Sequence, residues 1–218
     1  MSDPSPEGTA RISLKGEELL LSPERVVYWP AHQMLIVSDL HLGKAGHFRK
    51  HGIAVPASVH HHDLYTLTMV KNQFGARHIV FLGDLFHSEP NAQWRQLEDW
   101  VTNYGQERMT LVRGNHDILP DRLYEDLGME VVDELHVGPF HFTHEEELKE
   151  ATYNISGHLH PGVRLRGLAK QGLRIPCFYF RPENAYMPAF GKFTGLYTLR
   201  KRKQDKAFGI AENQVFSV

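Results

Sequence analysis

"IVFLGDLF", residues 79–86, is an apolar run that is interrupted by a glycine and an aspartate. A short run of β-branched and aromatic residues bounded in this way predicts a buried strand. Residues 56–75 and 90–104 on either side have apolar residues at helical spacing, and 33–39 and 108–117 contain further apolar strands. The order strand–helix–strand–helix–strand predicts parallel pairing through helical crossovers.

The regions outside this unit are rich in β-type runs. Short alternating or apolar segments precede it, beginning at Ala10, and a short helix at 120–128 follows it. The remaining strands are predicted at 129–137, 139–144, 152–157, 162–166, 175–181, 184–189, 194–200 and 207–217. We therefore expect an α/β fold, a sandwich of two packed sheets flanked by helices, in a single domain over 11–218 after a flexible tail at 1–10.

Composition excludes several classes of protein. The 218 residues carry a net charge of −2, which gives no global field for a polyanion, and the single Cys177 cannot form an intrachain disulfide. The polar N-terminus lacks the layout of a signal peptide, and no apolar run approaches the ~18 residues of a membrane span. We expect a cytoplasmic protein with no membrane partner, and nothing in the sequence indicates its oligomeric state.

Polar side chains with metal-binding atoms follow five of the predicted strands. Histidine is abundant, with 15 residues, and neutral imidazole is the commonest metal ligand in proteins. Open α/β sheets place their sites just beyond the carboxyl ends of strands, and nearby glycines let the backbone turn tightly. The candidate ligands are Asp39, His41, Asp84, Asn115, His144, His158 and His160.

These donors are carboxylates, an amide and imidazoles, without a thiolate. Mixed oxygen and nitrogen donors suit Mn²⁺, Fe or Zn²⁺, and seven are too many for one ion. They suit two ions that share a carboxylate, a pair that polarises a phosphoryl oxygen and lowers the pKa of bound water.

The sequence offers more than one ligand assignment for two pairs of histidines. In "ISGHLHPG", residues 155–162, an extended chain would point His158 and His160 to the same side, toward one metal ion, toward two, or into ordinary packing. His141 and His144 face opposite sides of a strand, so only one of them can reach the metals. We choose His144, because it lies at the end of its strand.

The ordered motifs D-x-H, G-D, G-N-H-D, H and G-H-x-H resemble those of the calcineurin-like metallophosphoesterase superfamily, whose fold is a two-sheet sandwich. The resemblance implies two divalent metal ions, with Asp84 bridging them. It places Asp39, His41, Asp84 and His160 on the first ion, and Asp84, Asn115, His144 and His158 on the second. It also implies catalytic roles for His116, which would face the phosphate, and for Asp117, which would orient His116 by a hydrogen bond.

Residues 38–56, 81–89 and 175–195 are similar to one bacterial branch, the ligase-associated DNA damage response endonucleases. This similarity implies a Mn²⁺-dependent phosphodiesterase that cuts DNA, most simply single-stranded DNA, beside an ATP-dependent DNA ligase, a helicase and an exonuclease. The alternative substrate is a small nucleotide, a dinucleotide or a lipid-linked pyrophosphate. A non-catalytic binding module is disfavoured by the intact ligand set.

Local charge permits contact with a nucleic-acid strand. Lys44 and Arg49 follow the first metal motif in a loop that also holds an aromatic residue, and Arg164 follows the last motif. His87 lies just beyond the G-D motif and is a further candidate for substrate contact. The triplet at 60–62 falls on a predicted helix, where successive side chains diverge, so we interpret these histidines as surface residues.

Overall fold

The computed structural model describes residues 6–44, 58–166, 172–192 and 194–218. Its first sheet has seven strands in the order β1-β2-β3-β4-β5-β6-β7. The first four strands pair antiparallel, and β4 to β7 pair parallel. The bounds are β1 (Ala10–Leu14), β2 (Glu17–Leu21), β3 (Val27–Trp29), β4 (Met34–Val37), β5 (His78–Leu82), β6 (Arg108–Val112) and β7 (Met129–Val132), with a short 3-10 helix η1 (Pro30–His32) before β4.

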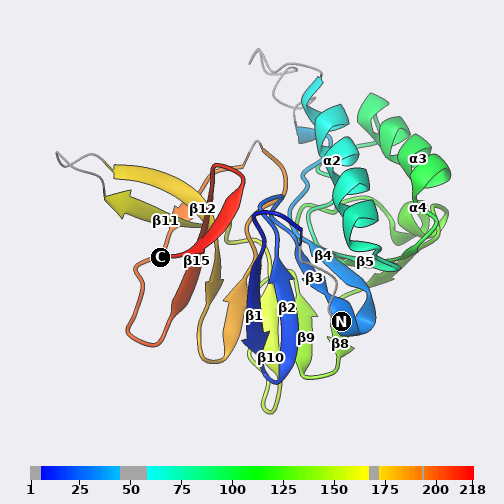
Figure 1. Ribbon diagram of the computed structural model, residues 1–218. Helices are drawn as coiled ribbons and strands as arrows, with labels where there is room; N and C mark the ends of the chain where they lie inside the picture. Colours follow the sequence, from blue (N-terminus) through cyan, green and yellow to red (C-terminus); the bar gives the residue numbers. More distant parts are fainter. Residues whose placement is uncertain (1–5, 45–57, 167–171, 193) are drawn as a thin grey trace.

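Within the described residues, three α-helices cover one face of the parallel half, as Figure 1 shows: α2 (Ser58–Phe74), α3 (Ala92–Tyr104) and α4 (Asp121–Glu125). The Asn91 side chain caps α3 by accepting the backbone N–H of Gln93. Trp94, Leu97 and Trp100 form the buried stripe of this helix and pack against the sheet. The predicted crossover helices and parallel strands are therefore present.

The second sheet has nine strands and packs against the free face of the first. Its main path runs β14-β11-β12-β13-β10-β9-β8, with the β15–β16 hairpin attached to β12. The bounds are β8 (Leu135–Val137), β9 (Phe140–Thr143), β10 (Tyr153–Ser156), β11 (Pro161–Arg166), β12 (Gly172–Phe180), β13 (Asn184–Tyr186), β14 (Tyr197–Thr198), β15 (Lys206–Ala211) and β16 (Gln214–Ser217).

The core between the sheets consists of large apolar side chains from both layers. Trp29 of the first sheet meets Phe140 of the second edge to face, with ring centroids 4.9 Å apart. Phe142 and Phe178 are fully buried in the same cluster. Each such side chain contributes roughly 1.5–3 kcal/mol by burial. The predicted α/β sandwich of two sheets flanked by helices is confirmed.

Two segments that were each predicted as one strand contain two strands in the structure. Residues 129–137 form β7 in the first sheet and β8 in the second, so the chain changes sheets at Asp133 and Glu134. Residues 207–217 form most of the β15–β16 hairpin, which turns at Glu212 and Asn213 with positive φ angles. A run of apolar residues does not reveal such a break, because both parts have the same composition.

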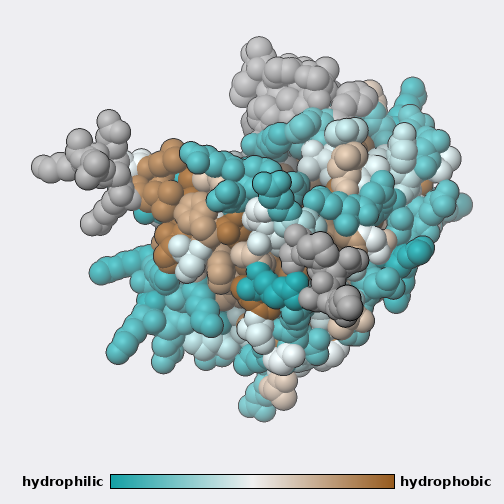
Figure 2. Space-filling view, in the orientation of Figure 1, coloured by the Kyte–Doolittle hydropathy of each residue, from teal (hydrophilic) through white to brown (hydrophobic). Residues whose placement is uncertain are grey.

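A smaller apolar cluster lies where β11, β12 and β15 curve away from the helices, and Figure 2 shows hydrophobic side chains gathered over these strands. Cys177 is fully buried there, and burial raises the pKa of its thiol to about 12. At the other end of the chain, residues 1–5 of the predicted tail lie outside the described residues, and Ala10 already belongs to β1. None of the described helices is long and apolar enough to span a membrane.

Candidate metal centre

The predicted ligands converge at one edge of the sandwich. Parallel strands β4, β5 and β6 of the first sheet end there, and so do the parallel pair β9 and β10 of the second. The segments that follow these five strands carry every ligand proposed from the sequence. Their polar atoms form two groups, which are Asp39, His41 and His160, and Asp84, His144 and His158.

The first group is almost completely buried. The Nε2 atoms of His41 and His160 are 3.4 Å apart, and His160 Nε2 lies 3.2 Å from Asp39 Oδ1. Burial lowers the pKa of His41 to about 3, so its imidazole is neutral at pH 7 and keeps a lone pair for a metal. Burial acts to raise the pKa of Asp39, but its contacts with His160 and Ser38 outweigh this and lower it. The group therefore offers the neutral imidazole of His41, the imidazole of His160 and a carboxylate.

The second group includes the amide of Asn115. His144 Nε2 lies 2.9 Å from Asn115 Oδ1, and His158 Nδ1 lies 3.2 Å from both of these atoms. His144 Nδ1 is held 2.9 Å from the carbonyl oxygen of Leu82, which fixes the ring so that Nε2 faces the group. This arrangement leaves one imidazole nitrogen of each histidine directed at the same point.

Asp84 lies between the two groups. Its Oδ2 is 3.7 Å from His41 Nε2, and its Oδ1 is 3.4 Å from His144 Nε2. One carboxylate thus presents a different oxygen to each group, as expected of a bridging ligand. The converging donors contain two buried carboxylates and fit two divalent metal ions in the chemistry of their atoms.

The "ISGHLHPG" segment divides its histidines between the groups. His158 joins Asp84 and His144, whereas His160 joins Asp39 and His41. The premise of an extended chain is wrong, because His158 and His160 have φ angles of 61° and 50° and lie outside any strand. Left-handed backbone at both residues sends the two side chains to different groups. The resemblance predicted this division, whereas the alternation rule for strands did not.

Left-handed backbone is a shared property of these ligands. Asp39, His41 and Asp84 have φ angles of 54°, 50° and 52°, in addition to the two histidines above. Such conformations cost about 1–2 kcal/mol per residue for side chains other than glycine. The surrounding hydrogen bonds maintain them: the His41 N–H donates to the Asp84 carbonyl oxygen at 2.8 Å, and the His158 N–H donates to Asp39 Oδ2 at 3.1 Å.

Three glycines lie directly against the ligands. A Cβ on Gly83 would overlap the His144 ring, and a Cβ on Gly114 would overlap the backbone nitrogen and Oδ1 of Asp84. A Cβ on Gly157 would overlap Ser38 Oγ and lie 2.7 Å from Asp39 Oδ2. The glycines of the motifs are therefore needed for space at the centre.

His116 lies beside the two groups without belonging to either. Its ring centroid is 5.9 Å from that of His41 and 3.9 Å from that of His87. The His116 N–H donates to Asp84 Oδ1 at 2.9 Å, which ties its position to the bridging carboxylate. The ring of His87, predicted for substrate contact, therefore packs at a tilt of 34° against the residue predicted to face the phosphate.

Asp117 does not make the predicted hydrogen bond to the His116 ring. Its carboxylate accepts backbone N–H groups from Asp84 and Gly114 at 2.8 Å and from Phe86 at 3.0 Å. The side chain is 2 % exposed, and burial raises its pKa to about 6. Asp117 is therefore a positioning residue that joins the ends of β5 and β6.

The predicted substrate contacts are dispersed. Lys44 is partly buried, and burial lowers its pKa while the nearby Asp84 and Asp39 carboxylates act to raise it. Arg49 lies outside the described residues. Arg164 is exposed on β11 opposite Arg174, on a hairpin that projects away from the helices (Figure 1).

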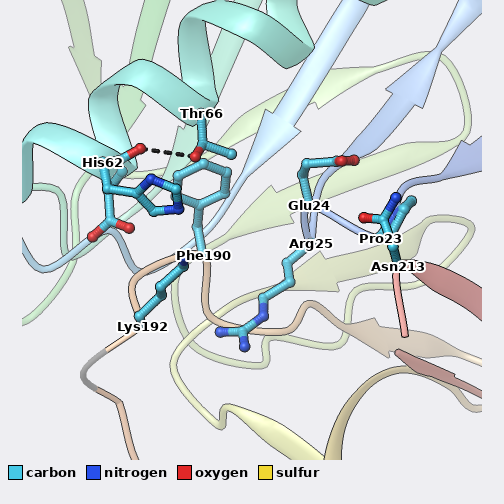
Figure 3. A pocket seen from close by; sticks show the side chains of 9 residues that line it. Pro23, Glu24, Arg25, His62, Thr66, Phe190, Lys192 and Asn213 are labelled. Atoms are coloured by element: carbon cyan, nitrogen blue, oxygen red, sulfur yellow. Dashed lines mark hydrogen bonds between the residues drawn. The ribbon is translucent and has the colours of Figure 1, made fainter. Parts of the chain in front are cut away.

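A cavity of about 320 Å³ lies at the start of α2 (Figure 3). Arg25 and Lys192 line it together with Glu24 and Asp63, so its formal charges balance. Burial raises the pKa of Asp63 to about 6, although Lys192 and Arg25 act to lower it. None of its lining residues was predicted as a site residue.

Ser38, which the sequence motifs do not single out, donates its hydroxyl to Asp39 Oδ2. Its position immediately before the first metal motif is the only signal that the sequence offers. Of the histidine triplet on α2, His62 is exposed, as expected for a surface residue, and the side chains at 60 and 61 lie outside the described residues.

Comparison with known structures shows a protein that is similar over nearly the whole chain. The Pseudomonas putida nuclease MPE matches with a TM-score of 0.80 and 27% sequence identity, over 96% of this chain and 100% of that chain. This is the calcineurin-like metallophosphoesterase fold. The resemblance stated from the motifs is confirmed, and so is the class of enzyme, a metal-dependent hydrolase.

Two further solved structures are less similar to this chain. AQ665 from Aquifex aeolicus, a protein of unknown function, has a TM-score of 0.42 and 18% identity, over 58% of this chain and 78% of that chain. YfcE, a phosphoesterase from E. coli, has a TM-score of 0.45 and 14% identity, over 85% and 97%. No family model and no curated protein sequence matches the chain.

Proposed function

We propose that this metallophosphoesterase is a two-metal phosphodiesterase that cuts single-stranded DNA with Mn²⁺ as its ion. The observation that carries the proposal is the position of Asp84, with one carboxylate oxygen toward each group of ligands. Similarity to a nuclease over 96% of the chain supports a nucleic acid as substrate.

In this proposal the residues divide as the motifs predict. Asp39, His41, Asp84 and His160 hold the first ion, and Asp84, Asn115, His144 and His158 hold the second. The ions, when bound, polarise the phosphoryl group and lower the pKa of bound water. His116 is partly buried beside the centre, where its ring can donate to a phosphate oxygen or protonate the leaving oxygen. The His87 ring packs at a tilt against that of His116 and limits its movement.

The chemistry of the donor atoms limits the metal to three ions, of which manganese is one. Carboxylate, amide and imidazole donors without thiolate suit Mn²⁺, Fe or Zn²⁺. The metal-free protein loaded with each ion in turn should be most active with Mn²⁺ at equal occupancy, measured by turnover of a nucleotide diester. Higher activity with Zn²⁺ or Fe²⁺ would remove manganese from the proposal.

A small nucleotide, a dinucleotide or a lipid-linked pyrophosphate remains the second candidate substrate, and one observation favours it. A cavity of about 330 Å³ beside Asn115 and His144 is also lined by Asp133, Glu145, Glu146 and Glu147. These four acidic side chains outnumber the one lining cation, Arg113, so this side of the centre is net negative. It repels a long phosphate backbone, with its many charges, more strongly than a small substrate with few. A DNA strand would therefore approach from the side of Lys44.

The deciding experiment incubates Mn²⁺-loaded protein with single-stranded circular DNA and, separately, with a dinucleotide and a small nucleotide diester. Asp84→Ala is the control for contaminating nucleases. Nicking of the circle by the wild type alone supports a DNA endonuclease. Hydrolysis of the small substrates without nicking supports the second candidate, and hydrolysis of neither contradicts both.

A role in DNA repair beside an ATP-dependent ligase, a helicase and an exonuclease, in the cytoplasm, extends the proposal. It rests on the sequence resemblance of residues 38–56, 81–89 and 175–195. Genes for the ligase and the helicase next to the gene for this chain would support it, and neighbours from lipid or nucleotide metabolism would count against it.

A further inference from the structure

A third cluster of metal-binding atoms lies outside the centre, at the β8 edge of the second sheet. One nitrogen each from His136 and His141 and one oxygen from Glu134 lie within 4.8 Å of one another. Glu134 Oε2 is 2.7 Å from His141 Nε2 and 3.7 Å from His136 Nε2. None of these residues contributes to the two groups described above.

The strand register creates this cluster. His136 on β8 pairs directly with His141 on β9, and their rings stack in parallel with centroids 4.2 Å apart. Glu134 immediately precedes β8, where the chain has just left the first sheet. The two imidazoles therefore present their Nε2 atoms to the same carboxylate oxygen.

We propose that Glu134, His136 and His141 bind a third divalent ion, of which Zn²⁺ is the best match, separate from the proposed catalytic pair. Two histidines and one glutamate are a known protein ligand set for zinc, which leaves a fourth position for water. Tetrahedral zinc with bonds of ~2.0–2.1 Å needs ligand atoms about 3.4 Å apart. The separations of 2.7 and 3.7 Å from the carboxylate oxygen lie on either side of this value. Because the two rings lie in parallel planes and the buried His141 ring stays in place, the exposed His136 side chain has to turn out of the stack so that its Nε2 lone pair points to the ion.

The burial of His141 and the exposure of His136 suit a metal site that an ion can reach from solvent. The His141 side chain is fully buried, so the ring is fixed, and its Nδ1 has no hydrogen-bond partner among the described residues. Nε2 is thus the nitrogen that faces a ligand. His136 is 46% exposed, which gives an ion from solvent a route to the cluster.

Lys149 is the competitor for the carboxylate. Its ammonium contacts Glu134 Oε2, and this hydrogen bond, together with the one from His141, lowers the pKa of Glu134 to about 2. The carboxylate is therefore ionised at neutral pH. Lys149 Nζ also lies 3.3 Å from Glu147 Oε1, so it keeps an acidic partner when an ion takes its place on Glu134.

The proposal is tested by counting zinc. Metal-free protein is equilibrated with excess Zn²⁺, desalted and analysed by mass spectrometry of the metal content. We expect three ions per chain for the wild type and two for His136→Ala, whose exposed side chain makes little contribution to folding. Glu150→Gln removes one nearby negative charge without removing a ligand or the acidic partner of Lys149, and it should keep three.

A second measurement separates this site from the catalytic pair. In the Asp84→Ala variant, one ion per chain should remain, and it should be lost when His136→Ala is added. Zn²⁺ should also raise the melting temperature of Asp84→Ala but not that of the double variant. A wild type with two ions, or a His136→Ala variant that still binds three, would overturn the proposal, whether or not the protein cuts DNA.

Discussion

Replacing Gly157 by alanine tests the idea that the glycines make space for the metal ligands. The φ angle of Gly157 lies outside the left-handed region, so alanine is compatible with the backbone and only its Cβ matters. That atom would overlap Ser38 Oγ, and it would lie 2.7 Å from Asp39 Oδ2 and 2.9 Å from the Leu82 carbonyl oxygen. The carbonyl belongs to β5 and cannot withdraw, so the Asp39 carboxylate has to move.

The expected cost follows from two opposing effects. Overpacking by one methyl group in a tight core costs typically ~1–3 kcal/mol. Alanine restricts the unfolded chain more than glycine does, which raises the free energy of unfolding by about 0.4–1 kcal/mol. We expect the free energy of unfolding of the metal-free protein to fall by roughly 1–2 kcal/mol. Because Asp39 also accepts the His158 N–H, movement of this carboxylate disturbs ligands of both groups.

The assays are urea unfolding of the metal-free protein and calorimetric titration with Mn²⁺. Affinity for Mn²⁺ should fall at least tenfold, which corresponds to about 1.4 kcal/mol. Gly195→Ala is the matched control, since no atom of the described residues lies within 4 Å of its Cβ position and its φ angle is ordinary. Adding Ser38→Ala removes the overlap with Ser38 Oγ and should restore part of the lost stability and Mn²⁺ affinity. If Gly157→Ala matched Gly195→Ala in both assays, the reasoning would be refuted.

The other predictions concern single side chains. Asp84→Ala should lose both catalytic ions, measured as metal content at Mn²⁺ concentrations that saturate the wild type, and full retention of one ion would contradict a bridge. His116→Ala should keep its metal content while turnover falls by about 10²–10⁴-fold, and loss of metal would show that its role is different. The folded pKa of Asp63, about 6, exceeds the ordinary value of 3.8, so ionisation of this carboxyl is unfavourable in the folded state. As the pH rises from about 4 to about 6, Asp63→Asn should therefore become more stable relative to the wild type, by at most ~3 kcal/mol. Urea unfolding across this pH range checks it, and a constant difference would show that Asp63 ionises normally.

The sequence predicted the fold and the convergence of the candidate ligands because both depend on local pattern. Apolar runs define the strands, and the carboxyl ends of parallel strands meet at one edge. The choice of His144 over His141 also followed from local geometry, and the structure places His144 with Asp84, whereas His141 faces Glu134.

Features that depend on pairing between distant segments were not predicted. The stacking of His136 on His141 requires the register of β8 on β9, which the apolar pattern does not encode. The division of residues 129–137 between two sheets made the register of β8 on β9 still harder to predict. Asp117 was misjudged because its sequence neighbour His116 suggested a contact, whereas its carboxylate accepts backbone N–H groups, two of which belong to Asp84 and Phe86, more than 30 residues away.

The left-handed backbone of the ligands has a consequence for how the protein evolves. At His158 and His160, glycine or asparagine would fit the φ angles of 61° and 50° better than histidine does. In a mutant library screened for thermal resistance of the metal-free protein alone, these two replacements should be enriched at both positions. Selection for stability and selection for hydrolysis would then favour different residues there. A lineage released from the need for hydrolysis should lose these histidines early and keep the sandwich.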